Sequence, residues 1–267
     1  MLRDVLCSLP SVETWPCDEI NPVWRHGNLE VPHDAFPAEL AREKVKLFVR
    51  KRFLKQAKRS KATWLVEKTC ANTLRVGFIA EILPEARFLH ISRDGYDVVP
   101  SAMKRWKAEL DLSYTIAKAR FVPLTDFPYY LWRFTANRLA RLGKGNGERT
   151  VSTWGPRFLG MDKIANDLPL EELCARQWKA CEIAATEQLA RVPAEQVLSL
   201  RYEDFVVNPI SSMERIRAFL GAEWSDEQLK SSVAKVRPGS VGNGRRQLSE
   251  SQLETLAPFL QSGRVND

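Results

Sequence analysis

Three short apolar runs stand out along the chain, at about residues 63–67, 86–92 and 196–201. Each has the length and the flanking polar residues that are typical of a buried β-strand. Segments with apolar residues at helical spacing alternate with them, at 72–82, 98–109 and 171–191. Strands that alternate with helices predict an α/β fold, in which helices cover a central parallel sheet.

The pattern also predicts helices outside this core. Leu2, Val5, Leu6 and Leu9 share one face of a helix over residues 1–9. Residues 34–60 predict a long amphipathic helix, whose dense Lys/Arg face either binds an anionic partner or simply keeps the helix soluble. Residues 111–169 are less regular and contain a predicted helix over 129–142, which begins with Tyr129, Tyr130, Trp132 and Phe134.

Composition narrows the choice of function. The chain has 267 residues, which we treat as one domain over residues 1–267, and a net charge of +7 that suits an anionic ligand. Its five cysteines form no Cys-x-x-Cys pair and only three histidines are present, so we expect no metal site and reduced thiols. We find no nucleic-acid reader motif and no apolar run long enough for a membrane span, and we expect a cytoplasmic protein.

The end of the second predicted strand has the features of an anion site. Arg93 follows the apolar run, Asp94 and Gly95 turn the chain, and Pro100 is placed where we expect a helix to begin. Ser101 would then lie beside the unpaired N–H groups of the first helical turn, where a phosphate is stabilised. Arg93 adds a planar cation suited to bidentate phosphate contact. A solvated turn with an Arg–Asp ion pair is the alternative.

Two other strand ends carry comparable residues. Residues 64–72, WLVEKTCAN, place Lys68 after the first strand, and residues 197–205, VLSLRYEDF, place Tyr202 after the third. In order and spacing these elements resemble the motifs of the sulfotransferases that use 3′-phosphoadenosine-5′-phosphosulfate (PAPS) as donor. One departure is Cys70, which stands where that family usually has a proline. The resemblance implies that Arg93 and Ser101 hold the 3′-phosphate and that Tyr202 packs near the nucleotide.

The same resemblance suggests the catalytic groups. The acidic pair Asp18-Glu19 is similar to the Glu-Glu pair of tyrosylprotein sulfotransferases, and Glu19 takes the position of the proposed base. Trp15 and Trp24 could shield that carboxylate and raise its pKa, whereas a surface carboxylate pair is the alternative. Lys68 matches a family lysine that stabilises charge on the leaving nucleotide.

A basic, glycine-rich segment near the C-terminus is a further candidate donor contact. Relatives close a Gly/Arg loop over the 3′-phosphate, which assigns Gly244, Arg245 and Arg246 to donor binding. Successive N–H groups in such a loop can form an anion nest. An ordinary surface loop is the alternative.

One family element is not found in this sequence. The family's P-loop-NTPase-like fold begins with a strand and a loop that binds the 5′-phosphosulfate, whereas residues 1–9 already match the helix that follows them. Because that strand lies inside the sheet, its neighbours would have open edges without it. We therefore expect a natural start roughly 15 to 20 residues earlier.

These observations favour a PAPS-dependent sulfotransferase that acts on a hydroxyl of a small molecule, glycan or peptide. We expect residues 111–169 to line the acceptor pocket, although their aromatic residues could belong to the core instead. A noncatalytic nucleotide-binding or interaction protein derived from a sulfotransferase is the main alternative. A nucleotide kinase is disfavoured because the sequence contains no Gly-x-x-x-x-Gly-Lys-Ser/Thr loop.

Overall fold

The computed structural model describes residues 1–108, 120–132, 135, 154–239 and 241–260. In this part of the chain the strands form two parallel pairs. β1 (Val12–Thr14) pairs with β2 (Trp64–Val66), and β3 (Phe88–Ser92) pairs with β4 (Val197–Arg201). The three predicted strands are confirmed, and β1 is an addition.

The predicted α/β class with parallel strands is confirmed, and the described strands lie in two pairs rather than in one continuous ladder. The described residues form two separate two-stranded sheets, with orders β1-β2 and β3-β4. β2 and β3 both line a cavity of about 780 Å³, and no described strand bridges them. All residues of β2 and β3 are half-buried, because each strand lacks a neighbour on one side.

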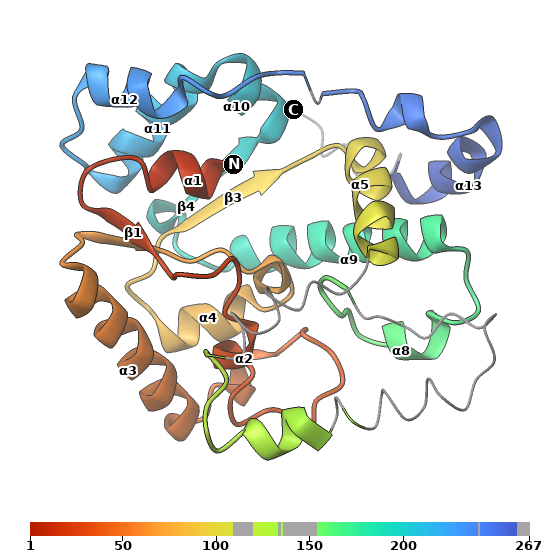
Figure 1. Ribbon diagram of the computed structural model, residues 1–267, viewed down its shortest axis with the longest axis horizontal. Helices are drawn as coiled ribbons and strands as arrows, with labels where there is room; N and C mark the ends of the chain where they lie inside the picture. The colour runs from red at the N-terminus through yellow and green to blue at the C-terminus, as the bar shows by residue number, and fades with distance from the viewer. Residues whose placement is uncertain (109–119, 133–134, 136–153, 240, 261–267) are drawn as a thin grey trace.

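Helices pack around both sheets (Figure 1). The longer ones are α3 (Glu43–Ser60), α5 (Gly95–Lys107), α9 (Leu170–Leu189), α11 (Pro209–Leu220) and α13 (Glu250–Leu260). The shorter ones are α1 (Leu2–Leu6), α2 (Asn21–Trp24), α4 (Val76–Ile82), α8 (Met161–Ile164), α10 (Tyr202–Val207) and α12 (Asp226–Val233). Four 3₁₀ turns complete the described elements: η1 (Ala38–Leu40), η2 (Cys70–Leu74), η3 (Ala194–Gln196) and η4 (Arg245–Gln247).

Most predicted helices are confirmed with shifted ends. The helix expected over 34–60 begins only at Glu43, and that expected over 72–82 divides into η2 and α4. Within the helix expected over 129–142, residues 127–132 are helical, and much of the remainder lies outside the described residues. None of the described helices has both the length and the apolar character needed to cross a membrane.

The start of α5 differs from the prediction. The helix begins at Gly95 because the side chain of Asp94 caps it, accepting a hydrogen bond from the backbone N–H of Tyr96 at 2.7 Å. Pro100 therefore lies inside the helix rather than at its first position, and Ser101 lies nearly two turns in. The expectation that Ser101 borders the N–H groups of the first turn is wrong.

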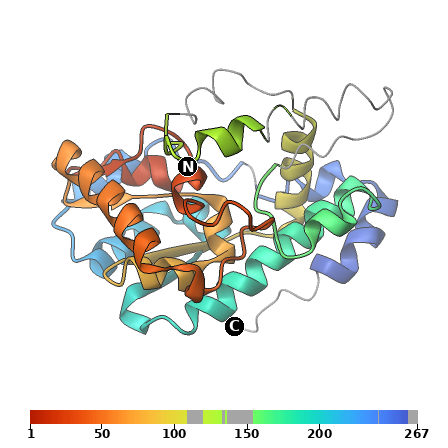
Figure 2. The same cartoon turned by 90° about the horizontal axis from the view of Figure 1, so that it is seen from below.

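Helix α9 links the two sheets. It packs against α5, α13, η2 and α4, and in Figure 1 it runs across the middle of the molecule, while Figure 2 shows the same helix running obliquely along the lower part of the view. The indole N–H of Trp178 donates to the backbone carbonyl of Arg93 at 3.1 Å, directly after β3. Gln188 bonds the backbone of Gly77 and Leu74, in the connection that follows β2. The strand ends on either side of the cavity are therefore held by one helix.

Candidate active site

Lys68 and Glu19 come together at the carboxyl end of β2. The ammonium of Lys68 lies 3.4 Å from Oε1 of Glu19, and the backbone N–H of Cys70 donates to the same oxygen at 3.2 Å. Asp18, the other half of the acidic pair, instead accepts a hydrogen bond from Arg3 at 2.8 Å. The resemblance to relatives thus selects two residues, 49 positions apart, that the fold brings into contact.

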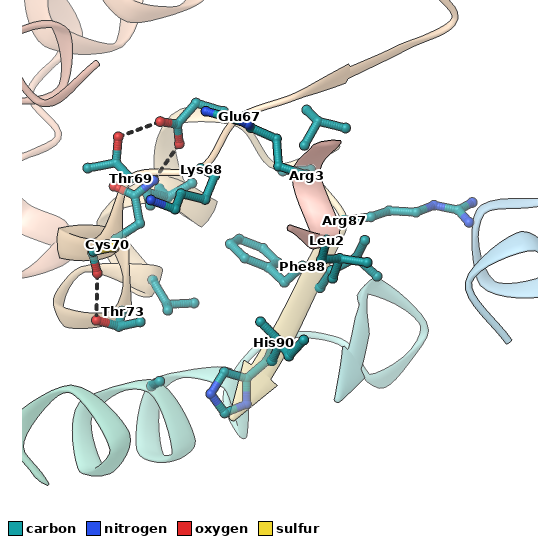
Figure 3. A pocket seen from close by; sticks show the side chains of 18 of the residues that line it. Leu2, Arg3, Glu67, Lys68, Thr69, Cys70, Thr73, Arg87, Phe88 and His90 are labelled. Carbon is teal, nitrogen blue, oxygen red and sulfur yellow. Dashed lines mark hydrogen bonds between the residues drawn. The ribbon is translucent and has the colours of Figure 1, made fainter. Parts of the chain in front are cut away.

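The neighbouring Glu67 does not compete for Lys68. Its carboxylate accepts hydrogen bonds from the hydroxyl of Thr69 and the amide of Asn72 (Figure 3). Lys68, which also lines the cavity, contacts Glu19 instead. The side chain of Lys68 is 50% exposed and that of Glu19 is 22% exposed, so both remain within reach of a ligand.

The charges around this pair fix its protonation. Burial alone would lower the pKa of Lys68, but Cys70 and Glu19 outweigh it and raise the pKa above its usual value. Burial likewise raises the pKa of the Cys70 thiol to about 11. Lys68 is therefore a cation and Cys70 a neutral thiol at physiological pH.

Arg93 lies at the carboxyl end of β3 and lines the same cavity as Lys68. Its guanidinium lies 4.3 Å above the ring centre of Tyr202, a cation–π contact that orients the group. Ser101 also lines the cavity, from α5, and is exposed. Of the predicted donor residues, Arg93 and Tyr202 are in contact just before α5, and Ser101 lines the same cavity as Arg93 from a later turn of that helix.

The Gly/Arg segment lies on a different side of α5. The backbone N–H groups of Gly242 and Gly244 donate to the carboxylate of Asp97, each at 2.7 Å. The anion nest that we expected there is therefore already filled by this carboxylate. Arg245 lies 4.6 Å above the ring centre of Tyr96, and Arg246 donates to Asn243. Gly244, Arg245 and Arg246 are not among the described residues that line the cavity.

Two titratable residues in the cavity were missed in the sequence. Glu182 reaches the cavity from α9, and its pKa is raised to about 7 by burial and by the nearby charge of Glu203. His90 lines the cavity from β3, and burial lowers its pKa. Nothing in their local sequence marks them, since a glutamate on a helix and a histidine in an apolar strand are both common. Within the described residues, no three His, Cys, Asp or Glu side chains gather closely enough to hold a metal ion.

The fold and the site together define an α/β protein in which two strand ends present a lysine and an arginine to one cavity, and the lysine contacts a carboxylate. The model of a family described as the sulfotransferase family matches residues 21–145 and 149–226, and the chain belongs to this family. The match includes Lys68, Arg93, Ser101 and Tyr202, whereas Glu19 and the Gly/Arg segment lie outside it.

The first of two similar solved structures supports the fold. The sulfotransferase domain from the curacin biosynthetic pathway is similar to 97% of this chain over 92% of its own length, with a TM-score of 0.50 and 11% identity. Sulfotransferase STF9 from Mycobacterium avium is similar to 85% of this chain over 49% of its own length, with a TM-score of 0.45 and 13% identity. No curated protein matches the sequence. Family membership supports sulfotransferase activity in general.

Proposed function

We propose that the protein transfers the sulfuryl group of PAPS to a hydroxyl of an acceptor. The observation that carries this proposal is that Lys68 and Arg93, cations at the ends of strands in two different sheets, line one cavity. A donor with a phosphate at one end and a phosphosulfate at the other needs two such cations, one for each end. Membership of the sulfotransferase family supports the same reaction.

The residues around Arg93 suit the 3′-phosphate. The guanidinium can donate two parallel hydrogen bonds to phosphate oxygens, and its stacking on Tyr202 fixes the plane from which they are donated. The exposed hydroxyl of Ser101 can donate a third. The backbone of this turn is itself fixed, because Trp178 holds the carbonyl of Arg93 and Glu203 accepts the N–H of Asp94 at 3.0 Å.

The residues around Lys68 suit the transfer. The acceptor oxygen forms a bond to sulfur while the bond between sulfur and the phosphate oxygen breaks. Glu19 takes the proton from the attacking hydroxyl, and Lys68 stabilises the negative charge that grows on the leaving phosphate. The products are a sulfated acceptor and adenosine 3′,5′-bisphosphate. Contact with Lys68 and with the N–H of Cys70 holds the carboxylate of Glu19 in place beside the proposed transfer site.

The acceptor in this proposal is a hydroxyl of a small molecule, a glycan or a peptide. Around the proposed reacting groups the cavity has apolar walls, to which Phe53, Leu54 and Trp154 contribute. Such walls favour an acceptor with apolar surface next to its hydroxyl. A screen of alcohols, sugars and tyrosine peptides with radiolabelled PAPS identifies the class.

The experiment that tests the proposal measures binding and turnover separately. We expect adenosine 3′,5′-bisphosphate to bind in calorimetry, and radiolabel to move from PAPS to at least one acceptor. Lys68→Ala and Glu19→Gln should abolish most transfer but leave binding, whereas Lys230→Ala, on the exposed surface of α12, serves as the matched control. Binding without transfer to any acceptor would contradict the proposed reaction and favour a noncatalytic nucleotide-binding protein.

A further inference from the structure

Helix α3 holds all of the net positive charge of the chain. Eight of the 40 lysines and arginines lie in this helix, together with one of the 33 acidic residues. The difference equals the net charge of +7 of the whole chain, so basic and acidic residues balance everywhere else. Solubility requires only that charges be spread over the surface. Their concentration on one helix of 18 residues therefore indicates a local role.

The cations on the inner side of α3 are used by the fold. Lys46 forms an ion pair with Glu81 at 2.6 Å, and Arg50 forms one with Glu85 at 2.9 Å. The apolar residues of the same side pack into a core cluster. This side of the helix therefore has its partners within the chain.

The outer side of α3 carries an exposed strip of lysines and leucines, which we call the α3 strip. Its members are Lys44, Leu47, Lys51, Leu54, Lys55 and Lys58. At helical spacing they lie within an arc of about 100° and extend over roughly 20 Å of the helix. None of the four lysines has an ion pair or a side-chain hydrogen bond with a described residue, and the two leucines are 68% and 58% exposed. The helix lies at the left edge of the molecule in both views, so a large flat partner can approach it (Figure 1 and Figure 2).

The α3 strip is unfavourable in water. Lys51 and Lys55 are four positions apart and Lys55 and Lys58 three, so like charges are neighbours on the helix surface and repel each other. The two leucines expose apolar surface among these charges. A partner that relieves both costs is anionic and also has an apolar interior that a leucine side chain can reach. An anionic lipid bilayer has both properties, whereas a nucleic acid or a polyanionic glycan offers mainly the charge.

We propose that the α3 strip docks the protein on the surface of a bilayer that contains anionic lipids. The helix axis lies in the plane of the interface, the lysines contact the headgroups, and Leu47 and Leu54 reach the boundary with the acyl chains. This inference goes beyond the proposed function, because docking needs neither donor nor acceptor. Leu54 also lines the cavity, so docking brings one edge of the cavity next to the bilayer.

Co-sedimentation of the full chain with vesicles tests the docking. One set of vesicles contains phosphatidylcholine alone, and the other contains phosphatidylcholine mixed with phosphatidylserine. We expect binding to the mixed vesicles only, and we expect added salt to release the protein, because salt screens the attraction between lysines and headgroups. Equal binding to both sets, or no binding to the mixed vesicles, would overturn the proposal.

Two triple variants assign the binding to α3. The first replaces Lys51, Lys55 and Lys58 by glutamine and should weaken binding to the mixed vesicles about 100-fold, because three contacts with headgroups are lost. The matched control removes the same charge from exposed positions outside α3, by glutamine at Lys163, Lys230 and Lys235. It should bind within about threefold of the unaltered chain, because charges away from the docked face are screened. An equal loss in both triple variants would mean that net charge alone carries the binding, and it would overturn the proposal.

A leucine variant distinguishes a bilayer from a polyanion. Leu47→Ser should weaken binding to the mixed vesicles about tenfold, because an apolar side chain no longer reaches the acyl boundary. Leu159→Ser, which alters a leucine that is 72% exposed elsewhere on the surface, should have no effect. Thermal unfolding verifies that each variant is folded. Unchanged vesicle binding in Leu47→Ser, together with binding of the unaltered chain to a DNA duplex or to heparin, would assign the α3 strip to a polyanion and overturn the bilayer as its partner.

Discussion

Replacing Asp34 by alanine should strongly destabilise the fold, because this carboxylate joins two buried arginines. Asp34 is 2% exposed, and its Oδ1 lies 2.8 Å from Nη1 of Arg25 and 3.9 Å from Nη1 of Arg75. Its Oδ2 accepts the backbone N–H of Arg157 at 3.0 Å. Arg25 is 6% exposed and Arg75 is fully buried, so neither cation can reach water if the carboxylate is removed.

The expected loss follows from these distances. At 2.8 Å and an effective dielectric constant of about 20, the attraction between Asp34 and Arg25 is about 6 kcal/mol before the cost of burying the charges. That cost offsets most of it in the intact protein. Removal of one partner leaves the cost of burying the other, and such changes typically destabilise by about 3–5 kcal/mol. The total stability of a domain is only about 5–15 kcal/mol.

Urea-induced unfolding at pH 7 measures this prediction. Asp34→Ala should lose about 3–5 kcal/mol of unfolding free energy. The control, Asp226→Ala, breaks an exposed ion pair with Arg217 and should lose at most about 1 kcal/mol. If both variants lose the same small amount, the buried network contributes little and the reasoning is refuted.

Acidification provides a second measurement of the same carboxylate. Burial acts to raise the pKa of Asp34, but the charges of Arg75 and Arg25 and the hydrogen bonds from Arg157 and Arg25 outweigh it and hold the pKa below its usual value. The stabilisation is therefore complete above the unfolded pKa and is lost as the pH falls through the lower, folded value. The difference in stability between the unaltered chain and Asp34→Ala should shrink below about pH 4.

Four further changes test the site and the packing around it. Lys68→Ala should reduce kcat about 100-fold at saturating PAPS by removing a cation from the leaving group, and an unchanged rate would exclude that role. Arg93→Ala should weaken binding of adenosine 3′,5′-bisphosphate about 10- to 100-fold in calorimetry, equivalent to about 1.4–2.7 kcal/mol, and equal affinity would contradict the phosphate assignment. Cys70, with its thiol pKa of about 11, should react with iodoacetamide at pH 8 about 100-fold more slowly than free cysteine, and comparable rates measured by mass spectrometry would contradict its raised pKa. Gly95→Ala should lower the unfolding free energy by about 1–3 kcal/mol in urea, because its Cβ would lie 2.6 Å from Cδ2 of Leu260, and an unchanged midpoint would show that this contact relaxes freely.

Local patterns predicted the strands and most helices well. The three predicted strands are apolar runs between polar ends, a signal that burial alone produces. β1 was missed because it has only three residues, of which Val12 alone is buried. The alternation of strands and helices predicted parallel strands correctly, whereas no local pattern indicated which strands pair.

The start of α5 shows why a correct motif can be misplaced. Both Asp94 and Pro100 are typical of helix starts, and the sequence alone favoured the proline. In the structure Pro100 supplies no N–H to the carbonyl of Tyr96, and Gly244 packs closely against that carbonyl. The local structure at the start of α5 therefore involves Gly244, which lies more than a hundred positions away in the sequence and also donates to Asp97.

Residues of the site were predicted to different degrees, because local motifs do not reveal contacts between residues distant in the sequence. Glu19, Lys68, Arg93, Ser101 and Tyr202 follow from motifs. Lys68, Arg93 and Tyr202 lie directly after β2, β3 and β4, whereas Ser101 lies within α5 and Glu19 lies between β1 and α2. Glu182 and Asp97 carry no motif. Their surroundings come from α9 and from the segment after α12, which only the folded chain brings together.

Because the described strands lie in two sheets, helix α9 sets the distance between Lys68 and Arg93. Lys68 and Arg93 belong to different backbone ladders, so no continuous set of strand hydrogen bonds sets the span between them. Instead, Trp178 and Gln188 of helix α9 bond the chain after β3 and the chain after β2, and these two contacts set the span. The distance between the two cations should therefore depend on how side chains pack along α9. Distant substitutions that tilt this helix should alter catalysis without contacting either cation.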